Sequence, residues 1–268
     1  MSISSKKLAK EIRISALKMV SKAKASHIGS ALSIVDILAV LYEEVMKYKP
    51  SDPNFVNRDR FILSKGHACV SVYAALAEVG FFKKEELKSY GENFSNLMNH
   101  ISHKISGVEF STGALGHGLP FAVGKALSAK FKDEEWSTFV VLSDGEMDEG
   151  SNWEALMFAS HHKLDNLTGI IDYNKLQSLD SISNTLALEP LDEKLNSFGC
   201  HTIVIDGHNH DELKNAFSES SFGKPKIIIA NTIKGKGVSF MENSVAWHYK
   251  SPTENELESA LIEINNEE

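Results

Sequence analysis

Acidic and amide side chains follow two apolar runs in the middle of the chain. Asp144 and Gly145 come directly after the apolar run 137–143, and Asn174 follows the next apolar run, 167–173. If these runs are neighbouring parallel strands, Asp144 and Asn174 lie side by side at the carboxyl edge of the sheet. Mg²⁺ prefers oxygen ligands and takes its remaining positions from water and phosphate oxygens. Together with a loop carbonyl, this pair predicts a metal site that anchors a diphosphate.

A purely structural role is the alternative for both residues. Asp, Gly and Asn are favoured in turns, so Asp144 would cap a helix starting near Ser151 and Asn174 would only form a turn. A calcium loop of the EF-hand type is a further competitor, but DGEMDEG lacks its alternating ligands, central Gly and terminal bidentate Glu. The spacing by itself leaves the metal site and the structural role both open.

Strands and helices alternate along the rest of the chain. Continuous apolar runs predict strands at 61–63, 137–143, 167–173, 201–206 and 226–233. Helical patterns predict helices at 4–24, 34–46 (capped by Ser33), 68–79, 120–131, 151–162 and 210–221, then a weakly amphipathic helix in the tail 251–268 with disordered last residues. We therefore expect an α/β fold, a doubly wound and mostly parallel sheet flanked by helices, as a single domain over 1–268. The stretch 178–197 is predicted to be a long loop or surface insertion.

Composition narrows the class of protein. The chain has 268 residues, 42% of them hydrophobic, and a formal net charge of −8. No clustered Lys/Arg footprint is visible in the sequence, which argues against a nucleic-acid partner. Cys69 and Cys200 lack the spacing of a disulfide framework or a zinc site. No signal peptide or membrane-spanning run is visible, so we expect a cytoplasmic protein without a membrane partner.

Several stretches together resemble one family. The segments VVLSDGEMDEGSNWEA and IIDYNKLQ resemble the thiamine-diphosphate motif, which usually begins Gly-Asp-Gly and ends in Asn. Four further stretches resemble the N-terminal, diphosphate-binding domain of the transketolase family. They are KASHIGSALSIVDILAVLY, NRDRFILSKGHACVSVYAAL, SGVEFSTGALGHGLPFAVGKALSAK and ANTIKGKGVSFMENSVAWH. These stretches span almost the whole chain in the family's order. The resemblance favours the metal site over the structural role for Asp144 and Asn174.

The resemblance implies a cofactor, a metal and their ligands. The cofactor is thiamine diphosphate, with Mg²⁺ bridging its phosphates and Ca²⁺ or Mn²⁺ as substitutes. The metal ligands would be Asp144, Asn174 and the main-chain carbonyl of Leu176. Further contacts to the cofactor are implied for His67, Gly113, Ala114, Leu115, Gly145 and His248. Some positions depart from the family's pattern. Ser143 replaces the first Gly of the motif, and Tyr173 precedes Asn174 where an acidic residue or Asn is common. Tyr249 follows the Trp-His pair where Gly is frequent.

The resemblance also assigns catalytic roles. The active-site histidines would be His27, His67, His100 and His248, which suit proton transfer near neutral pH. Glu149 resembles a buried glutamate at the subunit interface that couples to the partner's site.

Other histidines and acids receive weaker assignments. His103 competes with His100 for one role, which we assign to His100. His117 stands where the family usually has Gln and is either an extra site residue or a neutral replacement. His161 and His162 are expected to be structural, while Glu146 and Asp148 are expected to face solvent.

The resemblance covers only the first domain of a full transketolase, and we expect the further domains to lie on another chain. The resemblance therefore implies the N-terminal subunit of a split transketolase, active only with a separate C-terminal subunit that binds the pyrimidine ring. A heterotetramer with two-fold symmetry is the expected assembly. It would transfer a two-carbon ketol unit from a ketose or ketose phosphate to an aldose or aldose phosphate. The alternatives are a related enzyme subunit for pyruvate or a specialised sugar, and a non-catalytic regulatory subunit.

Overall fold

Five parallel strands form the centre of the chain, in the spatial order β1-β2-β3-β5-β4. This computed structural model describes residues 4–266. The strands are β1 Arg60–Leu63, β2 Thr138–Ser143, β3 Leu167–Tyr173, β4 His201–Asp206 and β5 Lys226–Asn231. All neighbouring strands run parallel, which confirms the predicted α/β class. Each predicted strand end lies within two residues of the observed one.

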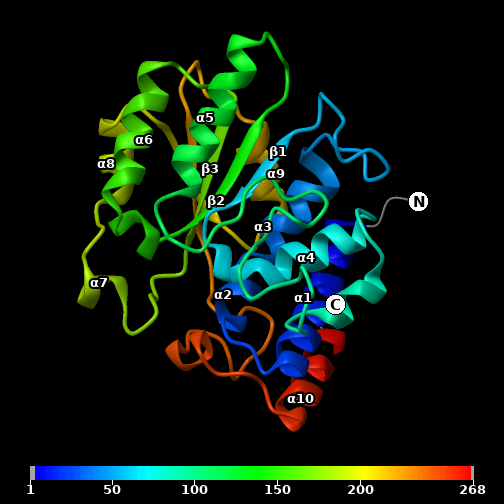
Figure 1. Cartoon of the computed structure of the whole chain (residues 1–268). Helices are drawn as coiled ribbons and strands as arrows, with labels where there is room; N and C mark the ends of the chain where they lie inside the picture. The colour runs from blue at the N-terminus through cyan, green and yellow to red at the C-terminus, as the bar shows by residue number, and fades with distance from the viewer. Residues whose placement is uncertain (1–3, 267–268) are drawn as a thin grey trace.

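Helices cover both faces of this sheet (Figure 1). One face packs against α5 Gly118–Phe131, α6 Gly150–His161 and α8 Leu191–Ser197, and the other against α1 Ser5–Ala23, α3 Val35–Val40, α4 Cys69–Glu78 and α9 His210–Ser218. Side chains alternate between these two cores along β5, with Ile228 in one core and Ile227 and Ile229 in the other. Because both faces are buried, the strands are apolar throughout rather than alternating with polar residues.

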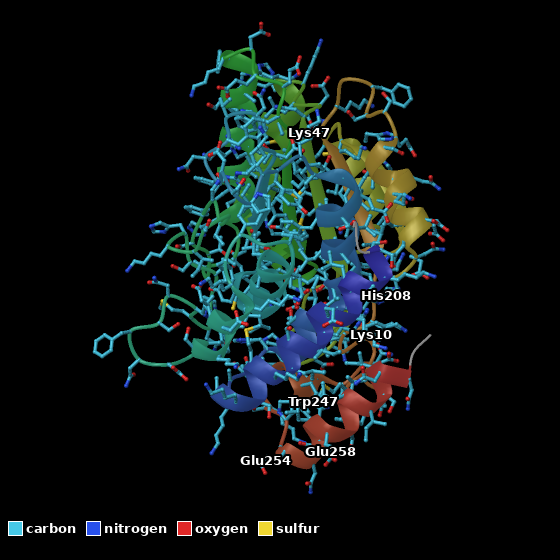
Figure 2. All side chains as sticks on the ribbon, turned by 90° about the vertical axis from the view of Figure 1, so that its right-hand side faces the viewer. Lys10, Lys47, His208, Trp247, Glu254 and Glu258 are labelled. Carbon is cyan, nitrogen blue, oxygen red and sulfur yellow. The ribbon has the colours of Figure 1, made fainter. Side chains whose placement is uncertain are left out.

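The first helix illustrates how the sequence pattern becomes packing. Ser4 caps α1 by accepting the N–H of Lys7. Leu8, Ile12 and Leu17 recur at helical spacing and are fully buried. The predicted tail helix is also present as α10 Glu254–Asn266, and it packs alongside α1 (Figure 2). The prediction of disordered last residues concerns 267–268, which lie outside the described residues.

Two predicted elements differ from the structure. In place of one helix over 34–46, the chain forms α2 Ile28–Ser33, α3 and a π-helical turn at Leu41–Val45. Ser33 does not cap a helix, because its hydroxyl donates to a buried carboxylate of β3 at 2.6 Å. The predicted loop 178–197 contains α7 Ile182–Thr185 as well as α8, whose Leu191 and Leu195 are buried.

The two cysteines do not form a disulfide with each other. Cys69 and Cys200 are both buried free thiols.

Within residues 4–266, no helix is both long enough and apolar enough to cross a membrane.

The packing of β5 leads to a test of the core. Replacing Ile228, which is fully buried, by Ala should lower the free energy of unfolding by about 2–5 kcal/mol. The substitution removes buried apolar contacts and leaves a cavity that the surrounding side chains do not fill. Val204→Ala on the edge strand β4 is the control, since Val204 is 54% exposed and its loss should change stability by about 0.5 kcal/mol or less. Urea unfolding measures both; equal effects would contradict this account of the core.

Candidate active site

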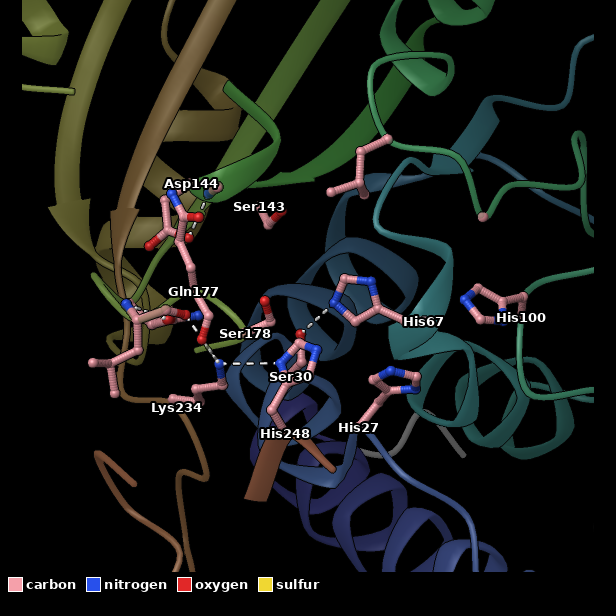
Figure 3. A pocket seen from close by; sticks show the side chains of 15 residues that line it. His27, Ser30, His67, His100, Ser143, Asp144, Gln177, Ser178, Lys234 and His248 are labelled. Atoms are coloured by element: carbon pink, nitrogen blue, oxygen red, sulfur yellow. Dashed lines mark hydrogen bonds between the residues drawn. The ribbon is translucent and has the colours of Figure 1, made fainter. Parts of the chain in front are cut away.

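A pocket of about 200 Å³ opens at the carboxyl ends of the central strands (Figure 3). Its walls come from segments far apart in the sequence: His27, Ser30, His67, His100, Gly113, Leu115, Ser143, Asp144, Gly145, Asn174, Leu176, Gln177, Ser178, Lys234 and His248. All predicted cofactor, metal and histidine site residues are in this lining except Ala114, which is exposed beside Gly113. The tertiary structure thus brings together residues that the sequence only placed in separate motifs.

The predicted metal ligands meet as the strand order requires. β2 and β3 are neighbours, with Ser143 paired to Asp172, so Asp144 and Asn174 emerge at the same edge. The Asp144 carboxylate accepts N–H groups from Gly145 at 2.7 Å and Lys175 at 2.6 Å. The Asn174 side-chain oxygen accepts the N–H of Leu176 at 3.1 Å. Burial, followed by the nearby charge of Asp172, raises the pKa of Asp144 to about 7.

These donors fit a divalent cation. A buried carboxylate with a raised pKa lacks a compensating charge, and a carboxylate, an amide oxygen and a carbonyl form the hard-oxygen set that Mg²⁺ accepts. Residues 4–266 contain no group of three or more His, Cys, Asp or Glu side chains arranged to hold a metal. A cation at Asp144 and Asn174 would therefore need carbonyl, water or phosphate oxygens for its remaining positions.

A buried ion pair that the sequence did not reveal lies beneath these ligands. Lys65 and Asp172 are both fully buried and form an ion pair. Asp172 also accepts hydrogen bonds from Ser33, Thr232 and the amide of Asn174. Burial alone would raise the pKa of Asp172, but Lys65 and the two hydroxyls together hold it below its usual value. Asp172 therefore stays ionised and fixes the orientation of Asn174.

Four histidines form the opposite wall of the pocket (Figure 3). The ring of His27 lies 5.2 Å from that of His67, 5.8 Å from that of His100 and 5.1 Å from that of His248, between ring centres. The main-chain N–H of His27 donates to the carbonyl of His248 at 2.8 Å, which holds the two segments together. His67 hydrogen-bonds Ser30 at 2.9 Å.

All four histidines have lowered pKa values. Burial and then the charge of His100 lower the pKa of His27 to about 4, and burial and then Lys234 lower that of His248 to about 3. Burial also lowers the pKa of His67 and of His100. The rings are therefore neutral at pH 7, and each offers one donor and one acceptor nitrogen.

Lys234 is a functional candidate that the sequence interpretation missed. Its ammonium donates to the carbonyls of Leu176 at 3.0 Å and Gln177 at 2.9 Å, and lies 3.3 Å from a ring nitrogen of His248. Burial, followed by the charge of Lys65, lowers its pKa to about 8. The second lone pair of the Leu176 carbonyl remains free for a metal. The repeated Lys-Gly pattern of IKGKG was the available signal.

The prediction that Glu146 faces solvent is wrong. Glu146 is fully buried, where its carboxylate accepts hydrogen bonds from the Ser64 hydroxyl at 2.5 Å and the Gly116 N–H at 2.9 Å. Burial raises its pKa although these bonds and that from Ser143 oppose the shift. The hydrogen bonds from Ser64 and Gly116 offset the cost of burying the Glu146 carboxylate. They also connect the end of β1 to the loop that carries Gly113 and Leu115. Asp148 is only partly exposed and accepts a hydrogen bond from Gln177 at 2.9 Å.

The remaining predicted residues lie outside the pocket. Glu149 is exposed within this chain, at the start of α6. His103 is exposed and bound to Ser111, whereas His100 lines the pocket, so the structure separates the two competitors. His117, His161 and His162 are also exposed. Tyr249 is 60% exposed, with its ring 4.8 Å from that of His248.

Comparison with known proteins identifies the class to which this fold and pocket belong. Residues 4–264 match the family model described as transketolase, thiamine diphosphate binding domain. The chain is therefore a member of the transketolase family, in its thiamine-diphosphate-binding domain.

Relatives of two lengths match the chain. It is 38% identical over 251 residues to one of the subunits of the apulose-4-phosphate transketolase of Phocaeicola vulgatus, covering 93% of this chain and 89% of that protein. It is 40% identical to the 6-deoxy-6-sulfo-D-fructose transketolase subunit SqwG of Clostridium sp., covering 96% and 94%. Human transketolase is 38% identical, with 97% of this chain matching 42% of that protein.

Solved structures agree with these relatives. Transketolase from Campylobacter jejuni superposes with a TM-score of 0.93 at 30% identity, over 99% of this chain and 43% of that one. Transketolase from Leishmania mexicana gives a TM-score of 0.92 at 32% identity, over 99% and 42%. The chain thus spans about two fifths of the length of these solved transketolases.

The Glu146 network leads to a test. Glu146→Ala should lower the free energy of unfolding by about 1–3 kcal/mol, because the buried N–H of Gly116 and hydroxyl of Ser64 lose their acceptor. Glu146→Gln keeps an acceptor oxygen and should cost less. Glu135→Ala, at an exposed carboxylate before β2, is the control and should leave stability nearly unchanged. If urea unfolding gave the same midpoint for Glu146→Ala as for the control, the network would have no structural role.

Proposed function

We propose that this chain is the N-terminal, diphosphate-binding subunit of a split transketolase and that residues 1–268 form one domain. It would transfer a two-carbon ketol unit from a ketose or ketose phosphate to an aldose or aldose phosphate, with thiamine diphosphate and Mg²⁺. The observation that carries the proposal is one pocket that joins Asp144 and Asn174 to His27, His67, His100 and His248. The split arrangement is supported by relatives of similar length that are themselves named as transketolase subunits and match over nearly their whole length.

The pocket residues divide the chemistry between its two walls. At the strand ends, Asp144, Asn174 and the Leu176 carbonyl would hold Mg²⁺ against the diphosphate. Lys234 adds a positive charge there, and the main chain at Gly145 and Gly113 allows close approach.

The histidine wall would handle protons. Thiamine diphosphate, when bound, supplies the nucleophilic carbon and the electron sink for breaking and forming the carbon–carbon bond. The neutral rings of His27, His100 and His248 can each donate to or accept from a sugar hydroxyl within the same pocket. The hydrogen bond between His67 and Ser30 would hold the His67 ring in place toward the cofactor.

A partner subunit completes the proposal. Relatives that match this chain over nearly their whole length are named as transketolase subunits, so we infer that a separate C-terminal subunit supplies the pyrimidine-binding half of the site. The exposed carboxylate of Glu149 at the start of α6 is a candidate contact across a two-fold heterotetramer. We further propose a cytoplasmic location without nucleic-acid or membrane partners.

A specialised sugar is the second candidate substrate. Two relatives are named for apulose-4-phosphate and for 6-deoxy-6-sulfo-D-fructose, which favours an unusual ketose over a central one. A non-catalytic regulatory subunit is disfavoured because the whole donor set and all four pocket histidines are present together. Nothing in the pocket favours pyruvate.

The metal assignment is tested by binding. In the complex with the C-terminal subunit, Asp144→Asn should weaken Mg²⁺-dependent binding of thiamine diphosphate by about 10- to 100-fold, because the only anionic ligand is lost. Calorimetric titration with and without Mg²⁺ measures this effect. Asp133→Asn removes one exposed carboxylate and should bind as the parent does. Unchanged affinity in Asp144→Asn would refute the ligand assignment.

Activity is tested on the same complex. The two subunits with thiamine diphosphate and Mg²⁺ should transfer a ketol unit from a ketose phosphate to an aldose phosphate. His100→Ala should lower kcat/KM by about 100-fold, as expected for loss of a proton-transfer group, while the exposed His103→Ala should stay within about twofold. Cofactor and partner binding without turnover on any ketose would contradict the proposed function. Equal losses in both variants would contradict only the role of His100.

A further inference from the structure

A second cavity, of about 460 Å³, lies away from the candidate active site. It is formed by the first half of α1, the start of α9, the segment 233–237 and the end of α10. Lys6, Lys7, Lys10 and Lys236 line it together with Arg13 and Asp36. Figure 2 shows Lys10 and His208, which also lines the cavity, close to each other near the start of α1. Lys236 lies more than 200 positions after Lys6, Lys7 and Lys10 in the sequence, so only folding brings it to them.

Among residues 4–266, Asp36 is the one carboxylate in this lining, and its hydrogen-bonding capacity is used by the protein itself. It binds Arg13 in an ion pair and accepts from His208 at 2.8 Å and His210 at 3.1 Å. The other ring nitrogen of His208 accepts the N–H of Ile233 at 2.8 Å, so His208 is a neutral donor to Asp36. Because the carboxylate of Asp36 is already engaged, it does not form an ion pair with the lysines that line the cavity.

The cations that surround the cavity differ in how far carboxylates compensate their charge. Arg13 is only 6% exposed, and its Nε lacks a hydrogen-bond partner. The ammonium of Lys236 is 3.7 Å from Glu242, and that of Lys10 donates to the carbonyl of Asn265 at 2.9 Å. No ion pair of the Lys6 or Lys7 ammonium is found among residues 4–266. Among residues 4–266, Lys6, Lys7 and Lys10 therefore line the cavity without an ion-pair partner, in a chain whose net charge is −8.

A concave site of this charge fits a small dianion. Low-dielectric walls strengthen the field of the grouped cations, and phosphate groups are commonly bound by several Lys and Arg donors. The volume lies in the range of sites for small molecules. The formal net charge of −8 disfavours nucleic acid as the ligand.

We propose that this cavity is a binding site for the phosphate group of a small phosphorylated molecule. The site is distinct from the candidate active site and does not depend on the proposed ketol transfer. The segment 233–237 nevertheless connects the two sites, since Lys234 lines the active-site pocket and Lys236 lines the second cavity. Its path is tightly held: Gly235 has a φ of +84° and donates to the carbonyl of Gly29 at 2.9 Å.

The test uses charge-matched variants of one helix. Lys6→Ala/Lys10→Ala removes two rim cations of the cavity, whereas Lys18→Ala/Lys22→Ala removes two cations from α1 outside it. Lys236 is left unchanged because it lies two residues from Lys234. Lys234→Ala serves as a third variant that reports binding in the active-site pocket. The full chain is used in every measurement.

Binding of inorganic phosphate is measured by calorimetric titration at constant ionic strength, with chloride as the reference anion. Glucose 6-phosphate and glucose are then compared in the same way. The dissociation constant for phosphate should rise about tenfold in Lys6→Ala/Lys10→Ala, because two charged donors are lost, and should stay within about twofold in Lys18→Ala/Lys22→Ala. Glucose 6-phosphate should bind and glucose should not.

Four outcomes would overturn the proposal. The first is equal phosphate affinity in Lys6→Ala/Lys10→Ala and the parent chain, which includes the case that neither binds. The second is equal weakening in Lys18→Ala/Lys22→Ala, which would show general charge screening. The third is loss only in Lys234→Ala, which would place the anion in the active-site pocket. The last is binding of a short nucleic-acid duplex without binding of inorganic phosphate.

Discussion

The buried ion pair between Lys65 and Asp172 is the interaction on which the candidate active site depends. Both side chains are fully buried, and either charge alone would carry a large desolvation penalty. Asp172 accepts from Ser33, Thr232 and Asn174 as well, so four segments converge on one carboxylate. The buried charge of Asp172 therefore holds together the end of α2, the strand ends and the loop that carries His67. Its burial is tolerable only because these segments all supply hydrogen-bond or ion-pair partners.

The parallel sheet makes this convergence useful. Because all five strands run in the same direction, their carboxyl ends meet at one edge, where main-chain N–H groups and polar side chains are free to face a ligand. Around that edge the charges remain partly uncompensated. Asp144 has a raised pKa and Lys234 a lowered one, and the histidines are neutral. A diphosphate with its cation would supply both of the missing charges, which accords with the thiamine-diphosphate family to which the chain belongs.

The same physical argument distinguishes the two polar cavities. In the active-site pocket, acids and cations are both present, and the donor set suits a metal with its diphosphate. In the second cavity, the one carboxylate found in the described part of the lining is already shared by Arg13, His208 and His210, so the surplus there is positive. The segment 233–237 contributes one lysine to each cavity, Lys234 to the active-site pocket and Lys236 to the second cavity.

The sequence by itself determined the strands and most of the helices. Continuous apolar runs are readable without tertiary information when a strand is buried on both faces. Motif order indicated Asp144, Asn174 and His100, which the structure brings into one pocket. Helix ends inside 28–45 and the short helices of 178–197 were not readable, because buried partners rather than propensity decide them.

Only the tertiary structure decided which charges are buried. Glu146 was expected in solvent, yet a hydroxyl and an N–H from distant segments satisfy its carboxylate in the interior. Lys65, Asp172 and Lys234 likewise became interpretable only with their partners, and the basic cavity exists only where α1 meets residues 208–236. Periodicity encodes which face of an element is apolar, whereas the burial of a charge depends on partners that folding alone brings within hydrogen-bonding distance.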